Sequence, residues 1–106
     1  MLGKRARLFL LLLLLPVSGC TWVQITDDGT RVQVRTPEQV QGCERRNRVT
    51  ASVKHEVLGI MRSEEKVREE LRTLARNEAA RQGDNAVVPE SEPSGGRQVF
   101  VVYHCP

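Results

Sequence analysis

The chain has 106 residues, with 16 Lys and Arg against 13 Asp and Glu, which is enough for one small domain and too little for two. The positive excess lies in residues 1–19, which hold three basic and no acidic residues, so the remainder is balanced at 13 of each sign. This balance removes the electrostatic argument for a nucleic-acid-binding protein, and we expect no nucleic-acid partner.

The first segment has the pattern of a secretory signal. Lys4, Arg5 and Arg7 precede a run of leucines and one phenylalanine over residues 8–15. At about 1.5 Å per residue, this run is too short to cross an apolar bilayer core about 30 Å thick. The basic start, short apolar run and small residues at the exit predict a signal peptide over residues 1–19 that takes no part in the fold.

The end of that signal, Val-Ser-Gly-Cys at residues 17–20, resembles the lipobox of bacterial lipoproteins. The resemblance implies that the Cys20 thiol carries diacylglycerol, and several acyl chains hold a protein firmly on a bilayer. Thr21 stands where an aspartate would resemble the inner-membrane retention signal of enteric lipoproteins. We therefore expect an anchor in the inner leaflet of the outer membrane, with the domain facing the periplasm. The alternative is an ordinary signal peptide with a chance cysteine.

The next segment predicts a β-hairpin. Apolar and polar residues alternate on both sides of the dipeptide Asp28-Gly29, which is a signal for a hairpin turn. The alternating apolar residues are Val23, Ile25, Val32 and Val34. We expect residues 20–41 to contain the lipidated N-terminus and this hairpin. The alternative is a partly extended tether.

Residues 43–57 predict the first long strand of an α+β domain over residues 42–106. A cysteine and three aliphatic residues share one parity, which places them on one face of a pleated strand. These residues are Cys43, Val49, Ala51 and Val53. The basic cluster Arg45, Arg46 and Arg48 is interpreted as a solvated strand edge, with lipid headgroups or lipopolysaccharide as the alternative. Gly59, inside a short apolar run, indicates a bulge or a turn.

From Ser63 the spacing of apolar residues changes to that of a helix, which we expect over residues 64–82. Ser63 is a suitable N-cap, acidic residues follow at the positive end of the helix dipole, and Gly83 supplies a left-handed stop. The apolar stripe consists of Val67, Leu71, Leu74, Ala75 and Ala79. We expect it to face a sheet; a partner-binding amphipathic helix is the alternative.

Two strands are expected after the helix, over residues 85–89 and 97–105, with a loop between them. The predicted order is hairpin, strand, helix, strand, strand, which gives a small mixed sheet of four to five strands packed by one helix. If the strands that flank the helix are parallel, the last strand returns antiparallel between them. That topology brings Cys105 to Cys43. Because the periplasm is oxidising and Cys20 is used for lipid, we expect these two cysteines to form a disulfide.

The helix exit and the chain end resemble a family of small proteobacterial envelope lipoproteins classed as a domain of unknown function. The resemblance covers residues 42–106. Its pattern is filled by Cys43, Leu71, Arg72, Ala79, Gly83, Asn85, Val87, Val88, Tyr103 and Cys105. The layout is distantly similar to RcsF-like outer-membrane lipoproteins, which report envelope stress by contacting partner proteins. Those proteins carry two disulfides and a long proline-rich tether, whereas this chain has one cysteine pair after Cys20.

The available side chains favour a non-enzymatic protein without a cofactor. His55 and His104 are the two histidines, no obvious nucleophile lies beside either in the sequence, and no G-x-S-x-G or H-E-x-x-H motif is present. We expect an interaction or envelope-maintenance role, with the bilayer and possible envelope proteins as partners. The alternative is a metal- or redox-responsive sensor that uses Cys43 and Cys105. Cys43, His55, His104 and Cys105 are ligand types that zinc accepts. Against a shared zinc site, His104 and Cys105 are neighbours that point to opposite faces of a strand.

Overall fold

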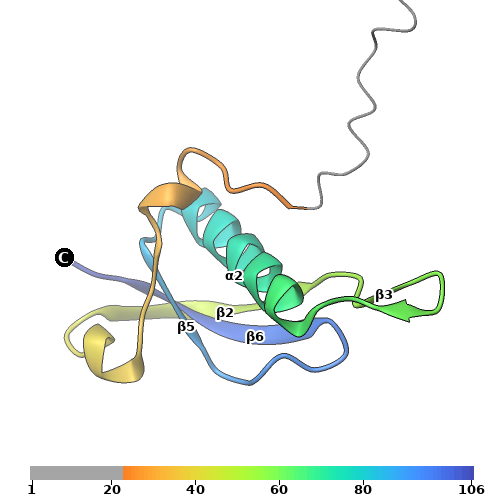
Figure 1. Cartoon of the computed structure of the whole chain (residues 1–106). Coiled ribbons are helices and arrows are strands. Elements are labelled where there is room, and N and C mark those ends of the chain that lie inside the picture. The colour runs from red at the N-terminus through yellow and green to blue at the C-terminus, as the bar shows by residue number, and fades with distance from the viewer. Residues whose placement is uncertain (1–22) are drawn as a thin grey trace, which may run out of the picture.

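The computed structural model describes residues 23–106, so the predicted signal peptide and the Cys20 lipid site lie outside the described part of the chain. One helix lies across a four-stranded sheet, and a small two-stranded hairpin extends from one end of the molecule (Figure 1). The predicted α+β class, mixed sheet, packed helix and disulfide are confirmed.

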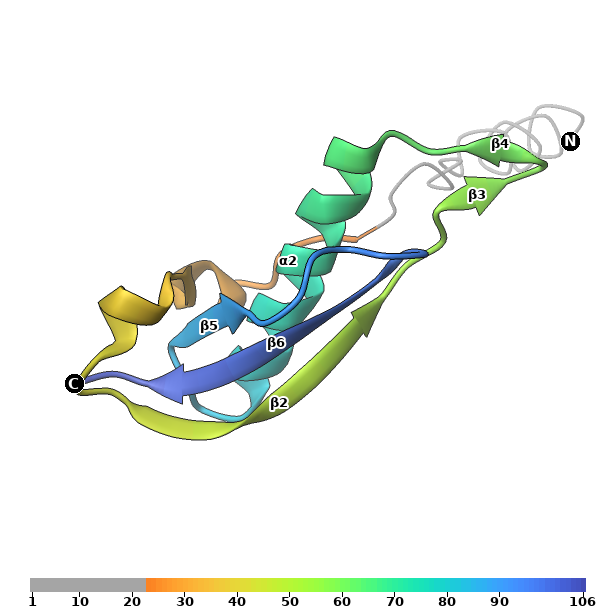
Figure 2. The same ribbon diagram turned by 90° about the horizontal axis from the view of Figure 1, so that it is seen from below.

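The four-stranded sheet has the order β1, β5, β6, β2. These strands are β1 (Gln33–Val34), β5 (Ala86–Pro89), β6 (Arg97–His104) and β2 (Glu44–Ser52). Figure 2 shows β5, β6 and β2 side by side. β1 runs parallel to β5, and β6 is antiparallel to both β5 and β2. The last strand therefore lies between the two parallel strands that flank the helix in the sequence, as the predicted topology requires.

The hairpin predicted around Asp28-Gly29 does not form within the described residues. Val23 and Ile25 belong to no strand, and the chain instead makes a short 3-10 helix, η1 (Gly29–Arg31), before β1. β1 then pairs with β5, with Gln33 opposite Ala86. The residues after Asp28-Gly29 therefore pair with a strand that lies more than fifty residues away in the sequence, and not with the residues before the turn.

The predicted hairpin does not form because side chains of the helix bind the N-terminal segment. The Asn77 side chain accepts a hydrogen bond from the Thr26 N–H and donates one to the Gln24 carbonyl, both at 2.9 Å. Arg76 Nε donates to the Val32 carbonyl at 2.8 Å. Val32 itself is buried in the core. The segment thus satisfies its backbone groups against the helix and not by folding back on itself.

The helix α2 (Glu64–Arg81) has the predicted extent and ends. The Ser63 side chain accepts a hydrogen bond from the Lys66 N–H at 3.4 Å, and Gly83 has a φ of +81°. Both ends therefore follow the local chemistry of helix caps. Among residues 23–106, no helix combines the length and the apolar character that a bilayer span requires.

The core has two parts, one on each face of the sheet. The larger part lies beneath α2 and consists of Val32, Ala51, Val67, Leu71, Ala75, Ala79, Val87, Phe100 and Val102. The smaller part lies beneath a second 3-10 helix, η2 (Pro37–Val40), and consists of Val40, Ala86, Val88 and Cys105, with Cys43 and Tyr103 packed against it. The helix stripe is thus core-facing, although Leu74 is only partly buried.

A β-bulge changes the face that β2 presents to the core. Arg45 lies opposite Tyr103 and Asn47 lies opposite Val102, so Arg46 is an extra residue between them. One inserted residue reverses the alternation of side chains. Cys43 consequently packs in the smaller core, whereas Val49, Ala51 and Val53 pack in the larger one. The prediction that these four residues share a face is wrong for this reason.

The apolar stripe predicts a graded response to truncation. Leu71 is 0% exposed, so Leu71→Ala should lower the free energy of unfolding by about 2–5 kcal/mol. Leu74→Ala should cost less because Leu74 is partly exposed. Arg72→Ala, on the exposed side of the same helix, is the matched control and should change stability by under about 0.5 kcal/mol. Urea unfolding would measure all three, and equal losses for Leu71→Ala and Arg72→Ala would contradict the packing.

Candidate functional site

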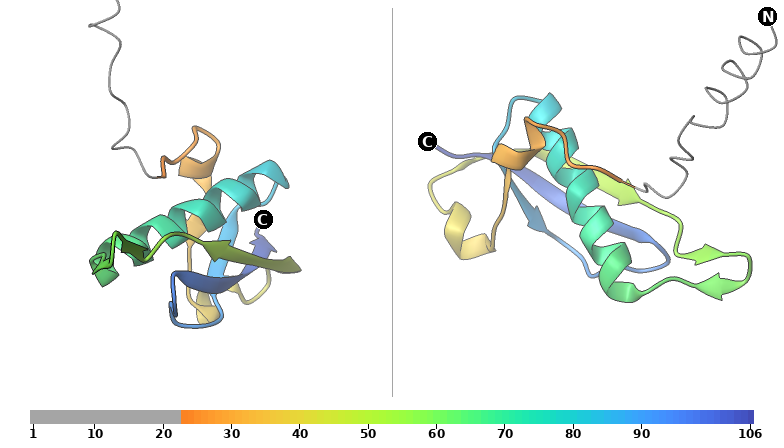
Figure 3. Two further views of the ribbon diagram at one scale, coloured as in Figure 1. Left: turned by 90° about the vertical axis from the view of Figure 1, so that its right-hand side faces the viewer. Right: turned by 45° about the horizontal axis from the view of Figure 1, so that its top comes forward.

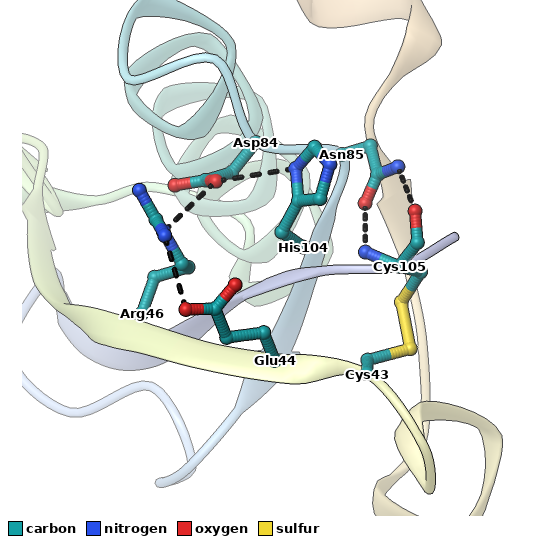
Figure 4. Close-up of polar contacts among 7 residues, drawn as sticks. All are labelled: Cys43, Glu44, Arg46, Asp84, Asn85, His104 and Cys105. Carbon is teal, nitrogen blue, oxygen red and sulfur yellow. Dashed lines mark hydrogen bonds and ion pairs between the residues drawn. A yellow bond between two sulfur atoms is a disulfide. The ribbon is translucent and has the colours of Figure 1, made fainter.

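The end of the sheet that carries the C-terminus gathers the two cysteines and several charged side chains (Figure 4). Cys43 precedes β2 and Cys105 follows β6, and their sulfur atoms are bonded across a Cα–Cα distance of 4.4 Å. The predicted disulfide is therefore confirmed. It joins the start of an edge strand to the end of the central strand beside it.

Asn85 positions one half of this disulfide. Its side-chain oxygen accepts a hydrogen bond from the Cys105 N–H, and its side-chain nitrogen donates to the Cys105 carbonyl, both at 2.8 Å. The amide thereby acts as a strand partner for Cys105 beyond the last backbone pair of β5 and β6, Ala86 with Tyr103. Because Cys105 is buried, these two bonds satisfy backbone groups that would otherwise lack partners.

Asp84 lies next to Asn85 and is the buried charge of this region. Its side chain is 3% exposed, and its Oδ1 lies 3.3 Å from Arg46 Nε and 3.4 Å from His104 Nδ1. Arg46 Nη1 also contacts Glu44 Oε1 at 3.2 Å. A buried carboxylate needs such partners, because an unpaired charge in the interior is costly. The contact with His104 becomes an ion pair when the imidazole is protonated.

The bulge in β2 explains how Arg46 reaches Asp84. Arg46 is the extra residue of the bulge, and it has no counterpart on β6. Bulges commonly redirect a side chain in this way. Arg48, two residues further along β2, instead pairs with Glu90 at 2.7 Å. The predicted basic cluster is thus divided between separate acidic partners.

The arrangement resembles part of a hydrolytic site, because an aspartate beside a histidine can orient a general base. Among the described residues, the recess beside Asp84 is lined by Glu44, Arg45, Arg46, Asn47 and Gln82, none of which has a hydroxyl or thiol group. The contacts that the structure shows are those of charge pairing, and they tie the helix exit to the bulge of β2 and the end of β6.

The structure does not bring together the four residues that the metal hypothesis requires. Cys43 and Cys105 are bonded to each other. His104 is the last residue of β6, whereas His55 lies beside Gly96, just before β6 begins. Within residues 23–106, no group of three or more His, Cys, Asp or Glu side chains is placed to hold a metal ion.

The family model of a domain of unknown function matches residues 23–105. The chain belongs to the DUF4156 family. No curated protein and no solved structure matches it. The expected membership of a family of unknown function is confirmed, and the match includes η1 and β1 as well as the helix and the later strands.

Sequence reasoning missed Asp84 and undervalued Asn85 in this DUF4156 domain. Asn85 was noted only as part of a family pattern. One local signal was available: both polar residues stand between a left-handed helix stop, Gly83, and a strand that is buried along most of its length. Polar side chains at such a position must find hydrogen-bond partners. The pairing of Asp84 with Arg46 depended on the bulge in β2, which the sequence did not indicate.

The disulfide predicts equal losses from either cysteine. It closes a loop of 62 residue steps, for which the chain-entropy estimate is about 4 kcal/mol. Cys43→Ser and Cys105→Ser should each lower the free energy of unfolding by about this amount, and the double variant should lose little more, since all three lack the same bond. Urea unfolding measures the losses. Two freely alkylated thiols in the untreated protein, found by mass spectrometry, would contradict the pairing.

The hydrogen bonds of Asn85 predict a second loss of stability, separate from that of the disulfide. Asn85→Ala leaves the buried N–H and carbonyl of Cys105 without these partners and should cost about 1–3 kcal/mol of stability. Asn47→Ala is the matched control because Asn47 is exposed on β2, and it should change stability by under about 0.5 kcal/mol. Chemical denaturation with the disulfide intact measures both. Equal effects of the two substitutions would refute the positioning role of Asn85.

Proposed function

We propose that the mature protein is a non-enzymatic, lipid-anchored domain of the bacterial outer membrane that faces the periplasm and contacts another envelope protein. The observation that carries this proposal is the disulfide between Cys43 and Cys105, since such bonds persist in oxidising compartments outside the cytoplasm. The lipobox-like residues 17–20 supply the means of attachment. Together they support an exported protein held on a membrane surface.

The short connection between anchor and domain favours a role close to the membrane. Cys20 and Val23 are three residues apart, and the family domain begins at Val23. Three residues span at most about 11 Å of extended chain. The proposed lipoprotein would therefore rest on the inner surface of the outer membrane and would not reach across the periplasm. The long reach of RcsF-like proteins is not part of this proposal.

The open edge of the sheet is the surface that we propose for an envelope protein partner. β2 has β6 as its one neighbour in the four-stranded sheet. Its nine residues are largely exposed, and an open edge can pair with a strand of another chain. Charged side chains on such an edge, here Arg45, Arg46 and Arg48, oppose self-association. A photo-crosslinking residue at Thr50 should therefore capture a partner protein that the same residue at Arg72 on the helix does not.

The second candidate is a redox-responsive sensor that uses Cys43 and Cys105. One observation favours it: Cys43 is partly exposed, whereas Cys105 is buried. The two candidates differ in the redox state expected in cells. A sensor requires a measurable fraction of reduced protein, whereas the first proposal expects the disulfide to be complete. Trapping thiols with a mass-tagged maleimide before lysis would distinguish them.

The anchor is tested by changing the proposed lipidated residue. Cys20→Ala should abolish incorporation of radiolabelled palmitate, because no other cysteine follows a lipobox-like sequence. Thr21→Ala is the matched control and should retain the label. Equal labelling of wild type and Cys20→Ala would refute the lipid anchor.

The sorting expectation has its own test at the next position. Thr21→Asp creates the residue that resembles an inner-membrane retention signal. This substitution should move the labelled protein from outer-membrane to inner-membrane fractions on a sucrose gradient. An unchanged distribution, or a wild-type protein already in the inner membrane, would contradict the proposed location.

A further inference from the structure

The hairpin that extends from the domain exposes an apolar tip. It consists of β3 (Glu56–Val57) and β4 (Ile60–Met61), joined by a turn at Leu58-Gly59 (Figures 1 and 3). Leu58 is 96% exposed, Ile60 71% and Met61 66%. Single exposed apolar residues are ordinary, but three at the end of a projecting hairpin form an unpartnered apolar surface.

The backbone of Leu58 adopts a conformation that is unfavourable for a leucine. Leu58 and Gly59 have φ values of +53° and +77°, as the two central residues of a type I′ turn require. Asn, Asp or Gly fits the first of these positions, whereas a leucine there is strained. The chain therefore keeps a large apolar side chain at a position where a small polar residue would fold more easily. Strain of this kind points to a function of the side chain.

The base of the hairpin is fixed to the helix by a largely buried ion pair. Arg62 donates to the two carboxylate oxygens of Glu70 at 2.9 and 2.8 Å, and to the Lys54 carbonyl at 2.8 Å. The side chains of Arg62 and Glu70 are 10% and 7% exposed. The hydrogen bonds that Arg62 donates to the Glu70 carboxylate raise the pKa of Arg62 above its ordinary value. The hairpin thus projects from a firm attachment on α2.

The hairpin and Val23, where the described chain begins, lie toward the same end of the molecule. Val23 lines one surface recess together with Lys54 and Arg62, at the base of the hairpin. Figure 2 and the right-hand view of Figure 3 show the start of the described chain, in orange, toward the hairpin end and away from the C-terminus.

The chain lengths on the two sides of that recess are similar. Cys20 is three residues from Val23, which is at most about 11 Å. Leu58 is four residues from Lys54, which is at most about 14 Å of extended chain. An acylated Cys20 and the hairpin tip can therefore reach one plane.

We propose that Leu58, Ile60 and Met61 insert into the bilayer that holds the acylated Cys20. This inference rests on the proposed lipid anchor and adds a second contact with the same lipid surface. Two contacts at separate points of the domain fix its orientation, which a single flexible anchor does not. The hairpin then lies at the membrane, and the disulfide end points into the periplasm.

The charges near the tip identify apolar burial as the source of the contact. Lys54 and Lys66 are opposed by Glu56, Glu64 and Glu65, all of them exposed. Arg62 and Arg68 are paired with Glu70 and Glu92. The surface around the tip is therefore nearly neutral and has no net attraction to anionic lipid. Insertion should change little with the salt concentration or with the fraction of phosphatidylglycerol.

The test uses the full chain, acylated in cells, purified, and reconstituted into vesicles of phosphatidylethanolamine and phosphatidylglycerol. Because Cys43 and Cys105 are bonded and Cys20 carries lipid, Leu58→Cys introduces a unique reactive thiol for an environment-sensitive fluorophore. Nitroxides on the lipid acyl chains should quench this probe several-fold more than the same probe at Glu38→Cys, which is exposed on η2 at the disulfide end.

A matched variant separates insertion from folding. With the probe placed by Glu56→Cys on the same hairpin, quenching should be lost when Leu58→Asn, Ile60→Thr and Met61→Thr are combined. Asn suits the left-handed position, and the three replaced side chains are exposed, so the urea midpoint should be unchanged or higher. Quenching that survives these three substitutions would overturn the assignment to the tip.

The remaining outcomes distinguish this inference from the anchor on which it rests. An acylated, vesicle-bound protein whose probe at position 58 is quenched no more than the probe at position 38 overturns the insertion and leaves the anchor intact. Crosslinks from position 58 to a second copy or to another protein, without quenching, also overturn it. A chain that carries no lipid on Cys20 and does not float with vesicles refutes the anchor itself.

Discussion

The two hydrogen bonds between the Asn85 side chain and the backbone of Cys105 connect elements that are far apart in the sequence. Asn85 stands at the exit of α2, immediately before β5, while Cys105 follows β6 and is bonded to Cys43 ahead of β2. One amide thus aligns the helix exit, two strands and the disulfide. Displacing it would leave the buried N–H and carbonyl of Cys105 without these partners, at the point where β6 meets the disulfide.

The polar face of α2 is as important to the architecture as its apolar stripe. Glu70 holds the hairpin through Arg62, and Asn77 and Arg76 hold the N-terminal segment. These contacts lie outside the apolar core, yet they determine the positions of the hairpin and of the N-terminal segment relative to the sheet. A helix that only packed on the sheet would leave the hairpin and the start of the domain without a defined direction.

Local chemistry explains which features were predictable. The limits of α2 follow from Ser63 and Gly83, and the central position of β6 follows from chain order and strand direction. The disulfide followed from the same topology. These features depend on residues near one another in sequence or on general rules of connection, so a single sequence is sufficient to infer them.

The remaining features depend on contacts between distant residues. The Asp28-Gly29 hairpin failed because Asn77, about fifty positions away, binds the segment that would have formed its first strand. The predicted face of Cys43 was wrong because β2 contains an extra residue, Arg46, which reverses the alternation of side chains. The Arg46 side chain contacts Asp84. An alternating pattern reveals neither a side-chain partner from another element nor a one-residue insertion.

The disulfide also divides the domain mechanically. Residues 43–105 form a closed covalent ring, and the described residues before the ring begin at Val23. Tension applied from a membrane anchor would therefore act first on the contacts of Asn77 and Arg76 with that leading segment. Those bonds can be peeled away in sequence while the ring keeps its length. The domain thus combines a leading segment that can be extended with a covalent ring that resists extension between Cys43 and Cys105.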